Sequence, residues 1–423
     1  MKIYGMDVQW ISEEHGLLKP DLDRTNAGVL PAVIRHLKGD FSRLKEMMDD
    51  RAVNPDLEER ISKYFPDGYD NVVFLICDGV GVGRLEALGG LIWDNINPNV
   101  DSQGTVAHCT FPSLTSTNMA SIAYGRLPKD HGLVGYNIYN ETIGEVFNAL
   151  NGEYVKDGEI KSIHEYPNDK FVEGQPITDI IDKEHFLPIR FFVPSQQERE
   201  GLITLIAEKT EITKYSTAEQ LLGGVISALS DGAPQQFIAA YIGWADYFGH
   251  EEGPESKEYT QAIRGIEQVL STIIGHPKVK NGSTLVILTS DHGQSQVDHS
   301  ISRWLSKDEV KKYADEGVVL STSGRVLHCY TQNIERGREI LEELAAGRGV
   351  VISQKEALEL IGDGGRWGER MGDLLLLMDD HYLVDVPEVV KLEGHKDKLI
   401  GQHGSVCIEE MFVPIGIWGG KHE

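Results

Sequence analysis

Two pairs of acidic and imidazole side chains stand out in the sequence. Asp291 and His292 are adjacent in the segment SDHG, and Asp246 and His250 are four residues apart in DYFGH. Carboxylate oxygens and neutral imidazole nitrogens are both good ligands for zinc-class ions. A spacing of four places two side chains on one face of a helix, where they can bind one ion. Each pair alone is also typical of an ordinary turn or helix start.

Two more residues have the chemistry of a metal ligand. Asp78 follows an apolar run in FLICDG, and His403 lies between two glycines in IGQHGS. Flanking glycines let the backbone bend sharply, so they can bring the imidazole into a crowded site. Taken singly, Asp78 is better explained as an N-cap or turn residue, and His403 is better explained as a surface-loop residue.

Hydroxyl side chains cluster in TFPSLTSTN, where Thr115 precedes a helical pattern that we expect to stop at Gly125. A helix N-terminus offers unpaired N–H groups and the positive end of a dipole to a phosphate. Serine and threonine are also common helix N-caps in any protein. A threonine hydroxyl is a poor nucleophile unless a base or a metal lowers its pKa. Thr115 therefore becomes a candidate nucleophile only in combination with the metal ligands.

Three apolar runs predict the strands that must position these residues. They are short and rich in β-branched residues, as buried parallel strands usually are. Each run ends close to one of the aspartates: 72–77 before Asp78, 237–242 before Asp246, and 284–289 before Asp291. Ligands of such sheets bind beyond the carboxyl ends of the strands. We therefore expect the three carboxylates to converge on one edge of the sheet.

Helical patterns alternate with these strands. Ser216 and Glu219 have the spacing of a capping box ahead of AEQLLGGVISAL, and the apolar residues of 263–274 fall on one helical face. This alternation predicts an α/β fold with a doubly wound, mostly parallel sheet and helices on both faces. We interpret residues 1–423 as a single catalytic domain.

Two stretches, roughly 140–205 and 305–395, are interpreted as insertions that form a smaller lobe over this domain. The first is polar and rich in turn formers. The second contains a helical pattern in ERGREILEELAAG, a strand-like LHCYT and a predicted hairpin, LLLLMDDHYLVDV.

The composition restricts the partners. With 66 acidic and 40 basic residues the net charge is −26 at pH 7, and no dense basic block is present, which argues against a nucleic-acid polymer. A small phosphate ester stays compatible, because bound divalent cations can reverse the local field.

The N-terminus lacks a basic start followed by an apolar run, and no apolar stretch reaches membrane-spanning length. The four cysteines form no C-x-x-C pair. We therefore expect a cytoplasmic protein that makes no membrane contact.

Taken in order, these features resemble the type I phosphodiesterase/nucleotide pyrophosphatase family of the alkaline phosphatase superfamily. The likeness extends from about Val72 to Pro414 and is looser in the insertions. It rests on the apolar strand ending in Asp78, the block F-P-S-x-T, the pattern D-x-x-x-H followed by SDHG, and a late HGS before EEMFVPI. Each motif is modest alone, but their ordered combination is specific.

The resemblance implies an alkaline phosphatase-like core, two bound divalent ions and a phosphorylated threonine as the reaction intermediate. Zinc is the expected metal and manganese the alternative. The implied roles are catalysis by Thr115, one ion held by Asp78, Thr115, Asp291 and His292, and the other held by Asp246, His250 and His403.

One position departs from the family pattern. The family places a phosphate-binding asparagine five residues after the histidine of an H-G pair, which here is His131. That position is Tyr136, and Asn137 follows it. Tyr136 or Asn137 is therefore the expected substrate-binding residue, and His131 itself is expected to be structural. The departure leaves the choice between diester and monoester substrates open, and we favour a diester or pyrophosphate.

The leading hypothesis is hydrolysis of a small phosphate ester, with nucleotides among the candidate substrates. The alternatives are a phosphomonoesterase or phosphonate hydrolase on the same metal pair, and a binding protein that has lost activity. The last alternative predicts a missing ligand or nucleophile, whereas all seven positions carry suitable residues. A formylglycine sulfatase is disfavoured because the segment at Cys109 lacks the arginine of C-x-P-x-R. No pattern in the sequence indicates an oligomeric state.

Overall fold

The three predicted apolar runs are adjacent strands of one central sheet. In the computed structural model they are β5 (Asn71–Cys77), β13 (Gln236–Ile242) and β14 (Thr284–Thr289), buried along their whole length and paired in parallel. Continuous apolar sequence is what a strand covered on both faces requires. The structure describes residues 1–140, 145–156, 159–162, 171–183, 187–196, 202–207, 210–363, 365–387 and 399–420.

The central sheet has seven strands in the order β12-β11-β13-β5-β14-β23-β6. Only β23 runs antiparallel to its neighbours, so the sheet is mostly parallel, as predicted. The outer strands are β12 (Ile212–Tyr215), β11 (Ile189–Pro194), β23 (Phe412–Trp418) and β6 (Thr105–His108). The strand β11 belongs to this sheet although it falls inside the first predicted insertion.

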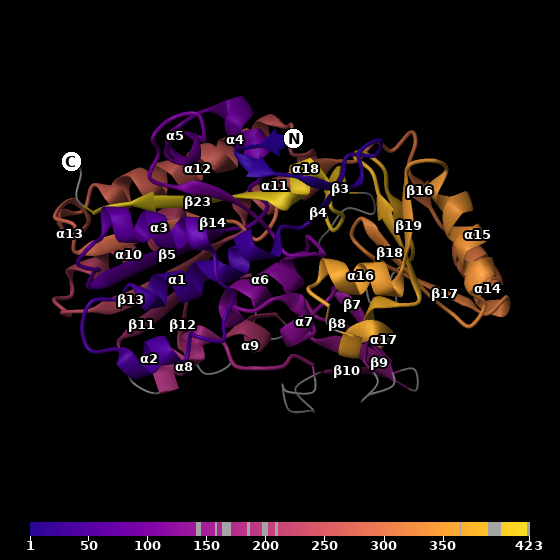
Figure 1. The fold of residues 1–423 in the computed structure, drawn as a ribbon, viewed down its shortest axis with the longest axis horizontal. Coiled ribbons are helices and arrows are strands. Elements are labelled where there is room, and N and C mark those ends of the chain that lie inside the picture. The colour runs from indigo at the N-terminus through magenta and orange to yellow at the C-terminus, as the bar shows by residue number, and fades with distance from the viewer. Residues whose placement is uncertain are drawn as a thin grey trace.

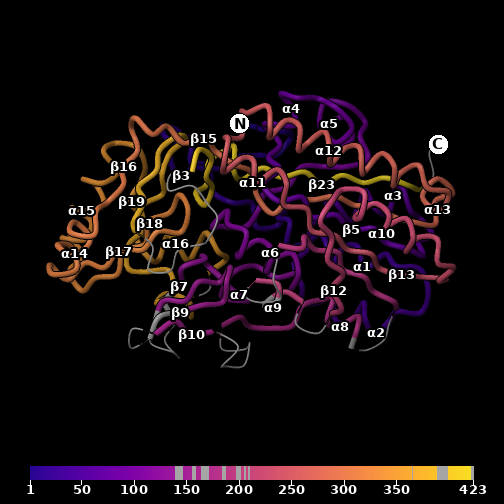
Figure 2. Tube along the Cα trace, turned by 180° about the vertical axis from the view of Figure 1, so that it is seen from behind, coloured from indigo at the N-terminus to yellow at the C-terminus, as the bar shows by residue number. Residues whose placement is uncertain are grey.

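Helices cover both faces of this sheet. Figures 1 and 2 show α1 (Val29–Arg35), α3 (Pro55–Tyr64) and α6 (Thr115–Tyr124) on one face and α10 (Ala218–Ser230) and α12 (Lys257–Ile274) on the other. The predicted α/β architecture is thereby confirmed. Helix α12 buries the predicted apolar face, including Ile263, Ile266, Val269, Leu270 and Ile273.

One helix start differs from its prediction. The N-cap of α10 is Thr217, whose side chain accepts a hydrogen bond from Gln220 N, so the capping box predicted for Ser216 is wrong. The backbone of Thr217 is extended, with φ −136° and ψ 160°, which aims its hydroxyl at the first turn. The Ser216 hydroxyl instead donates to Ser195 Oγ.

A smaller antiparallel sheet, β17-β18-β20-β19, lies beside the central sheet, at the right of Figure 1. Its strands are β17 (Val318–Ser323), β18 (Val326–Thr331), β20 (Leu374–Met378) and β19 (Gly349–Ser353), and the helices α14 (Lys307–Asp315) and α15 (Ile334–Ala345) belong to the same region. This region, residues 303–386, buries a hydrophobic cluster of its own. We call it the lobe.

The hairpin predicted from LLLLMDDHYLVDV is wrong. Its first half is β20, but its second half, β21 (Val384–Asp385), pairs in parallel with β16 (Arg303–Trp304). Strand β20 already has β18 on one edge and β19 on the other, so it has no free edge for the following segment.

A third sheet, the antiparallel order β10-β9-β8-β7, is formed by β7 (Asn137–Asn140), β8 (Glu145–Asn148), β9 (Glu153–Lys156) and β10 (Glu159–Ser162). Part of each predicted insertion, including residues 163–170 and 388–395, lies outside the described residues. The division into one catalytic domain with a single inserted lobe stays a prediction. Across the described part of the chain, every helix falls short of the length and apolarity that a bilayer crossing requires.

Short elements complete the fold. They are β1 (Lys2–Ile3), β2 (Met6–Asp7), β3 (Gln9–Ser12), β4 (Leu17–Lys19), α2 (Ser42–Glu46), α4 (Val82–Leu88), α5 (Leu91–Ile96), α7 (Pro128–His131), α8 (Ile177–Lys183), α9 (Leu202–Ile206), α11 (Trp244–Glu252), α13 (Pro277–Lys280), β15 (Ser295–Gln296), α16 (Gln354–Leu360), α17 (Gly368–Met371), β22 (Gly401–Gln402) and α18 (Ile408–Met411).

Candidate active site

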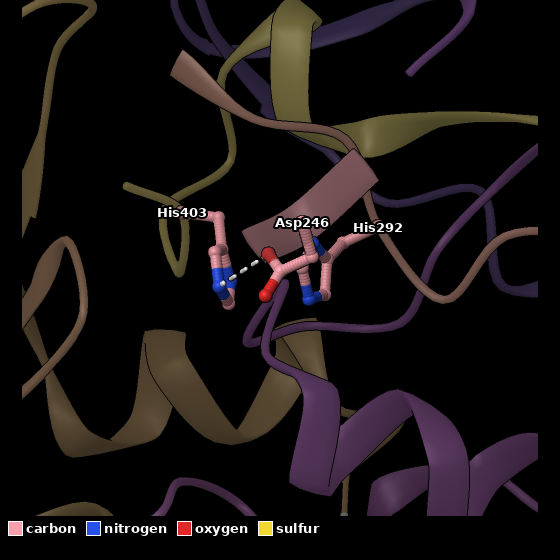
Figure 3. Close-up of side chains that lie close together, drawn as sticks. All are labelled: Asp246, His292 and His403. Carbon is pink, nitrogen blue, oxygen red and sulfur yellow. Dashed lines mark ion pairs between the residues drawn. The ribbon is translucent and has the colours of Figure 1, made fainter. Parts of the chain in front are cut away.

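The three predicted aspartates lie where their strands end, on one edge of the central sheet. Asp78 and Asp291 come shortly after β5 and β14, and Asp246 is in the first turn of α11, just beyond β13. Asp78, Asp291 and His292 present ligand atoms that all lie within 4.8 Å of one another. Asp246, His292 and His403 form a second such group, drawn in Figure 3, where the dashed line marks the ion pair between His403 Nε2 and Asp246 Oδ1, 3.7 Å apart.

His292 joins these two groups. Its Nε2 is 3.4 Å from Asp78 Oδ1 and 3.4 Å from Asp291 Oδ2. Its ring also stacks on His403, with centroids 3.6 Å apart and an interplanar angle of 17°. The family resemblance assigns His292 to the ion of Asp78 and Asp291, and in this structure the same imidazole also adjoins the second group.

The remaining two residues extend the cluster at either side. His250 Nε2 is 3.3 Å from Asp246 Oδ1, one helical turn away in α11, as the spacing of four predicts. Thr115, the first residue of α6, places its Oγ1 3.0 Å from His292 Nε2. All seven predicted residues are therefore contiguous. Thr115 and Asp246 are partly exposed and the other five are buried, so the site opens to solvent at the threonine and at Asp246.

The three histidines share one orientation. In each ring Nδ1 lies against a backbone carbonyl: 2.8 Å from Gly401 O for His250, 3.0 Å from Gly293 O for His292, and 2.7 Å from Ser113 O for His403. Because a carbonyl only accepts, Nδ1 must carry the hydrogen, which leaves the lone pair on Nε2. A metal-ligating histidine is usually held in this way by its second nitrogen.

The electrostatics of the cluster favour bound cations. Burial raises the pKa of Asp78 well above its usual range, and the charges of Asp246 and Asp291 raise it further. Burial likewise raises the pKa of Asp291, and it lowers the pKa values of His292 and His403. Three carboxylates packed this closely repel one another, and divalent ions supply the opposite charge.

Two carboxylate oxygens show where such ions fit. Asp78 Oδ1 and Asp291 Oδ2 are buried and receive no hydrogen bond from any residue that the structure describes. A buried oxygen of this kind normally has a partner, so both are suited to a metal ion. Carboxylate oxygens with imidazole nitrogens suit zinc and also accept manganese.

Two asparagines that the sequence did not single out hold the segment before Thr115. The fully buried Asn118 accepts hydrogen bonds from Thr110 N at 2.6 Å and from Asn26 Nδ2 at 3.3 Å. Asn26 Nδ2 also contacts the carbonyls of Ser290 and Asp291, at 3.2 and 3.1 Å. The pair thus links the threonine segment to the end of β14. The only local signal was an asparagine inside a helical pattern, where it is a poor helix former.

Two further residues orient carboxylates of the candidate metal site. The Tyr241 hydroxyl donates to Asp78 Oδ2, and Gln294 Nε2 donates to Asp246 Oδ1 at 2.8 Å. Each bond fixes one carboxylate oxygen, as outer-shell partners of metal ligands do. Tyr241 lies within a buried strand and had no sequence signal.

The predicted substrate-binding residues contact the lobe. The Tyr136 hydroxyl accepts a hydrogen bond from Gly324 N at 2.6 Å. Asn137 Nδ2 donates to Thr322 O at 3.3 Å, and Asn137 Oδ1 accepts from Asn148 at 3.2 Å. Substrate binding by Tyr136 or Asn137 stays a prediction.

His131 is held by bonds of a structural kind. Its Nδ1 accepts from Leu133 N at 3.1 Å, so its Nε2 carries the hydrogen and donates to Ser121 Oγ at 2.9 Å. The ring is fully buried. This geometry agrees with the structural role expected for it.

Comparison with known proteins gives one family. The profile of the type I phosphodiesterase/nucleotide pyrophosphatase family matches residues 72–405. Among curated proteins, a venom phosphodiesterase of Macrovipera lebetinus is 23% identical over 276 residues, which are 60% of this chain and 29% of that protein. Ectonucleotide pyrophosphatase/phosphodiesterase family member 3 of Bos taurus is 23% identical over 244 residues, 55% of this chain and 26% of the relative. The chain thus spans less than a third of the length of these relatives.

Solved structures share the fold. Murine ectonucleotide pyrophosphatase/phosphodiesterase 5 has a TM-score of 0.56 at 18% identity, covering 82% of this chain and 88% of the other. Phosphonoacetate hydrolase from Sinorhizobium meliloti 1021 has a TM-score of 0.57 at 17% identity, covering 83% and 90%. At this identity the similarity extends to the fold, and the chemistry must be argued from the site residues.

Proposed function

This chain belongs to the type I phosphodiesterase/nucleotide pyrophosphatase family, and from that premise we propose that it hydrolyses phosphodiester or nucleotide pyrophosphate bonds. We propose Thr115 as the nucleophile. The observation that carries this proposal is the position of Thr115 Oγ1, 3.0 Å from His292 Nε2, where His292 joins the two groups of metal-binding side chains. The substrate that we propose is a small phosphate ester, with nucleotides as the first class to test.

The family uses a two-metal site, and the residues of this chain fit one. We propose that Asp78, Thr115, Asp291 and His292 hold one ion and that Asp246, His250 and His403 hold the other. Zinc is the proposed metal, with manganese as the alternative. When bound, such ions lower the pKa of a coordinated hydroxyl and stabilise charge on the leaving oxygen.

The chain's own groups account for the rest of the reaction. Thr115 Oγ1 loses its proton and forms a bond to phosphorus, while the bond from phosphorus to the leaving oxygen breaks and that oxygen takes a proton. In the second step a water oxygen bonds to phosphorus and the bond from phosphorus to Thr115 Oγ1 breaks. A proton released by that water restores the Thr115 hydroxyl. The first N–H groups of α6 are not paired within the helix, and they favour the phosphate oxygens.

The test is a hydrolysis assay of bis-p-nitrophenyl phosphate, a nucleotide p-nitrophenyl ester and p-nitrophenyl phosphate, with zinc or manganese added. We expect the diesters to be preferred. Thr115→Ala should abolish turnover while about two ions per chain stay largely bound, measured by elemental analysis. Thr117→Val is the matched control, because the Thr117 hydroxyl is buried two residues further along α6 without a hydrogen-bond partner among the described residues.

Each outcome is decisive. Turnover that survives in Thr115→Ala would refute the nucleophile assignment. Preference for the monoester would keep the metals but make the protein a phosphatase. Inactivity on all three substrates would count against the proposed hydrolysis and for a binding role. The cytoplasmic location expected from the sequence stays a prediction.

A further inference from the structure

Glu410, at the C-terminal end of the chain, is a fully buried carboxylate outside the seven-residue cluster. Its Oε2 accepts three hydrogen bonds: from Ser113 Oγ at 2.8 Å, from Gly404 N at 2.8 Å and from Ser405 N at 2.7 Å. Ser113 precedes the proposed nucleophile by two residues, and Gly404 directly follows His403. A single oxygen therefore holds the threonine segment and the His403 segment together.

These contacts close a small ring around His403. The Ser113 carbonyl accepts the Nδ1 hydrogen of His403 at 2.7 Å, and the Ser113 hydroxyl is bound to Glu410, which in turn binds Gly404 N. The Ser113 hydroxyl also lies 2.9 Å from Gly404 N. The His403 ring is thus held at Nδ1 and directs Nε2 towards Asp246. Displacing Glu410 should therefore change the orientation of this ring.

The other carboxylate oxygen contacts the lobe. Glu410 Oε1 accepts from Ser295 Oγ at 3.0 Å and forms an ion pair with Arg325 Nη1. Arg325 lies in the turn between β17 and β18, and both side chains of the pair are fully buried. A buried carboxylate without its cation is strongly unfavourable, and Arg325 supplies the opposite charge beside Glu410.

Arg325 is itself fixed on both sides. Its backbone N donates to His403 O at 2.8 Å, while its guanidinium donates to Tyr382 O at 3.2 Å and to Asp379 O. The lobe thus reaches the metal-binding segment by two routes. One is the direct backbone bond to His403, and the other runs through Glu410.

We propose that Glu410, neutralised by Arg325, is the positioning residue that fixes His403 relative to the Thr115 segment, so that the lobe sets the geometry of the metal site. Its kinetic consequence rests on the proposed function. Its consequence for metal binding does not depend on turnover, so the two can fail separately.

The chemistry of the pair identifies a diagnostic variant. In Glu410→Gln the amide oxygen must take the place of Oε2, because three donors converge there. The amide NH₂ then faces the Arg325 guanidinium, donor against donor, whereas the Ser295 hydroxyl can turn and accept from it. Arg325→Met removes the opposing donor and its charge. The double variant should therefore regain part of what Glu410→Gln alone loses, a coupling that independent damage to two sites does not produce.

The experiment is a Co²⁺ titration of the metal-stripped full chain, followed by visible absorption, together with steady-state kinetics. Losing an outer-shell partner typically costs about 10- to 100-fold in metal affinity or activity. For Glu410→Gln we expect one of two Co²⁺ equivalents to bind about tenfold more weakly or worse, with an altered spectrum. We expect kcat to fall by about as much, with little change in KM.

Arg336→Gln is the control, because Arg336 forms an exposed ion pair with Glu316 in the same lobe, 2.7 Å apart. It should bind two Co²⁺ as the parent does.

A folded Glu410→Gln that binds both equivalents with parental affinity and spectrum would overturn the proposal. If that variant does not fold, Ser113→Ala replaces it, since it removes one donor to Glu410 and leaves the buried ion pair intact. Parental Co²⁺ binding in a folded Ser113→Ala would then overturn the proposal. A parent that binds two Co²⁺ but hydrolyses nothing would refute only the proposed function.

Discussion

Replacing Asn118 by alanine should loosen the segment that carries the proposed nucleophile. The Asn118 amide is fully buried, and its Oδ1 accepts from Thr110 N at 2.6 Å and from Thr110 Oγ1 at 2.8 Å. Its Nδ2 contacts three carbonyls, those of Thr110 at 3.1 Å, Pro112 at 3.1 Å and Leu114 at 3.2 Å. One side chain therefore holds the segment that leads into α6.

The magnitude follows from which groups keep another partner. The Leu114 carbonyl still accepts from the backbone N–H of residue 118, the Pro112 carbonyl from Leu114 N, and the Thr110 hydroxyl still meets Ser121 Oγ. The N–H and C=O of Thr110 lose their partner. Each unsatisfied buried group costs about 1–3 kcal/mol, and alanine returns about half a kcal/mol of helix propensity. We therefore expect the free energy of unfolding to fall by about 2–5 kcal/mol.

The assay is urea unfolding of the metal-free protein followed by circular dichroism, so that metal binding does not contribute to the measured stability. Thr117→Val is the control in the same helix. Its hydroxyl is buried with no hydrogen-bond partner in the described part of the chain, so the change should alter stability by less than about 1 kcal/mol. A loss below about 1 kcal/mol in Asn118→Ala would refute the reasoning, because it would mean that water satisfies Thr110 as well as the amide does.

Three more predictions can be checked with the same material. Gly324→Ala should weaken Co²⁺ binding and lower the free energy of unfolding, because the φ of Gly324 is +57° and an added Cβ would lie 2.0 Å from His403 O. Gly317→Ala is the control, since Gly317 has a φ of +78° and open space around it; this change should lower the free energy of unfolding by only about 1 kcal/mol and leave metal binding unchanged. Removing metal with a chelator should lower the free energy of unfolding by about 3 kcal/mol per ion at a free-ion concentration of 100 Kd, measured by urea unfolding with and without Zn²⁺. Burial raises the pKa of Asp385 to about 6, so the folded protein favours the neutral acid, and its stability falls as the pH rises through 6 and the buried group ionises. In metal-free thermal melts, Asp385→Asn should therefore be more stable than the parent at pH 8 and lose this advantage towards pH 4.

The elements that the sequence predicted well are those determined locally. Strands β5, β13 and β14 were recognisable because burial on both faces demands an unbroken apolar run. The end of α6 was recognisable because Gly125 adopts a left-handed φ of +58°, which favours glycine. The pairing predicted for the second half of the hairpin was wrong because a strand's partner depends on which sheet edges are free, and a local sequence pattern does not contain that information.

The candidate site shows the same difference between features determined locally and features determined by long-range contacts. The candidate ligands and their order were readable, since Asp291–His292 and Asp246–His250 are close in sequence, and the structure brings these side chains together. Their supporting residues were not. Asn26 and Asn118 are 92 positions apart, and Glu410 lies in the acidic segment IEEM, which has the composition of a solvated helix start. Such residues gain their roles only from contacts that folding brings together.

The histidine partners connect these supporting residues to the chemistry. A carboxylate behind each imidazole would add negative charge to a site that already contains three aspartates, whereas a backbone carbonyl orients the ring without adding a charge. The consequence is that each ring follows the backbone to which it is bonded. For His403 that backbone is Ser113, two residues before Thr115. Any change that moves this segment must therefore displace a proposed metal ligand and the proposed nucleophile together, which is why we expect metal affinity and kcat to decline in parallel in variants of Glu410.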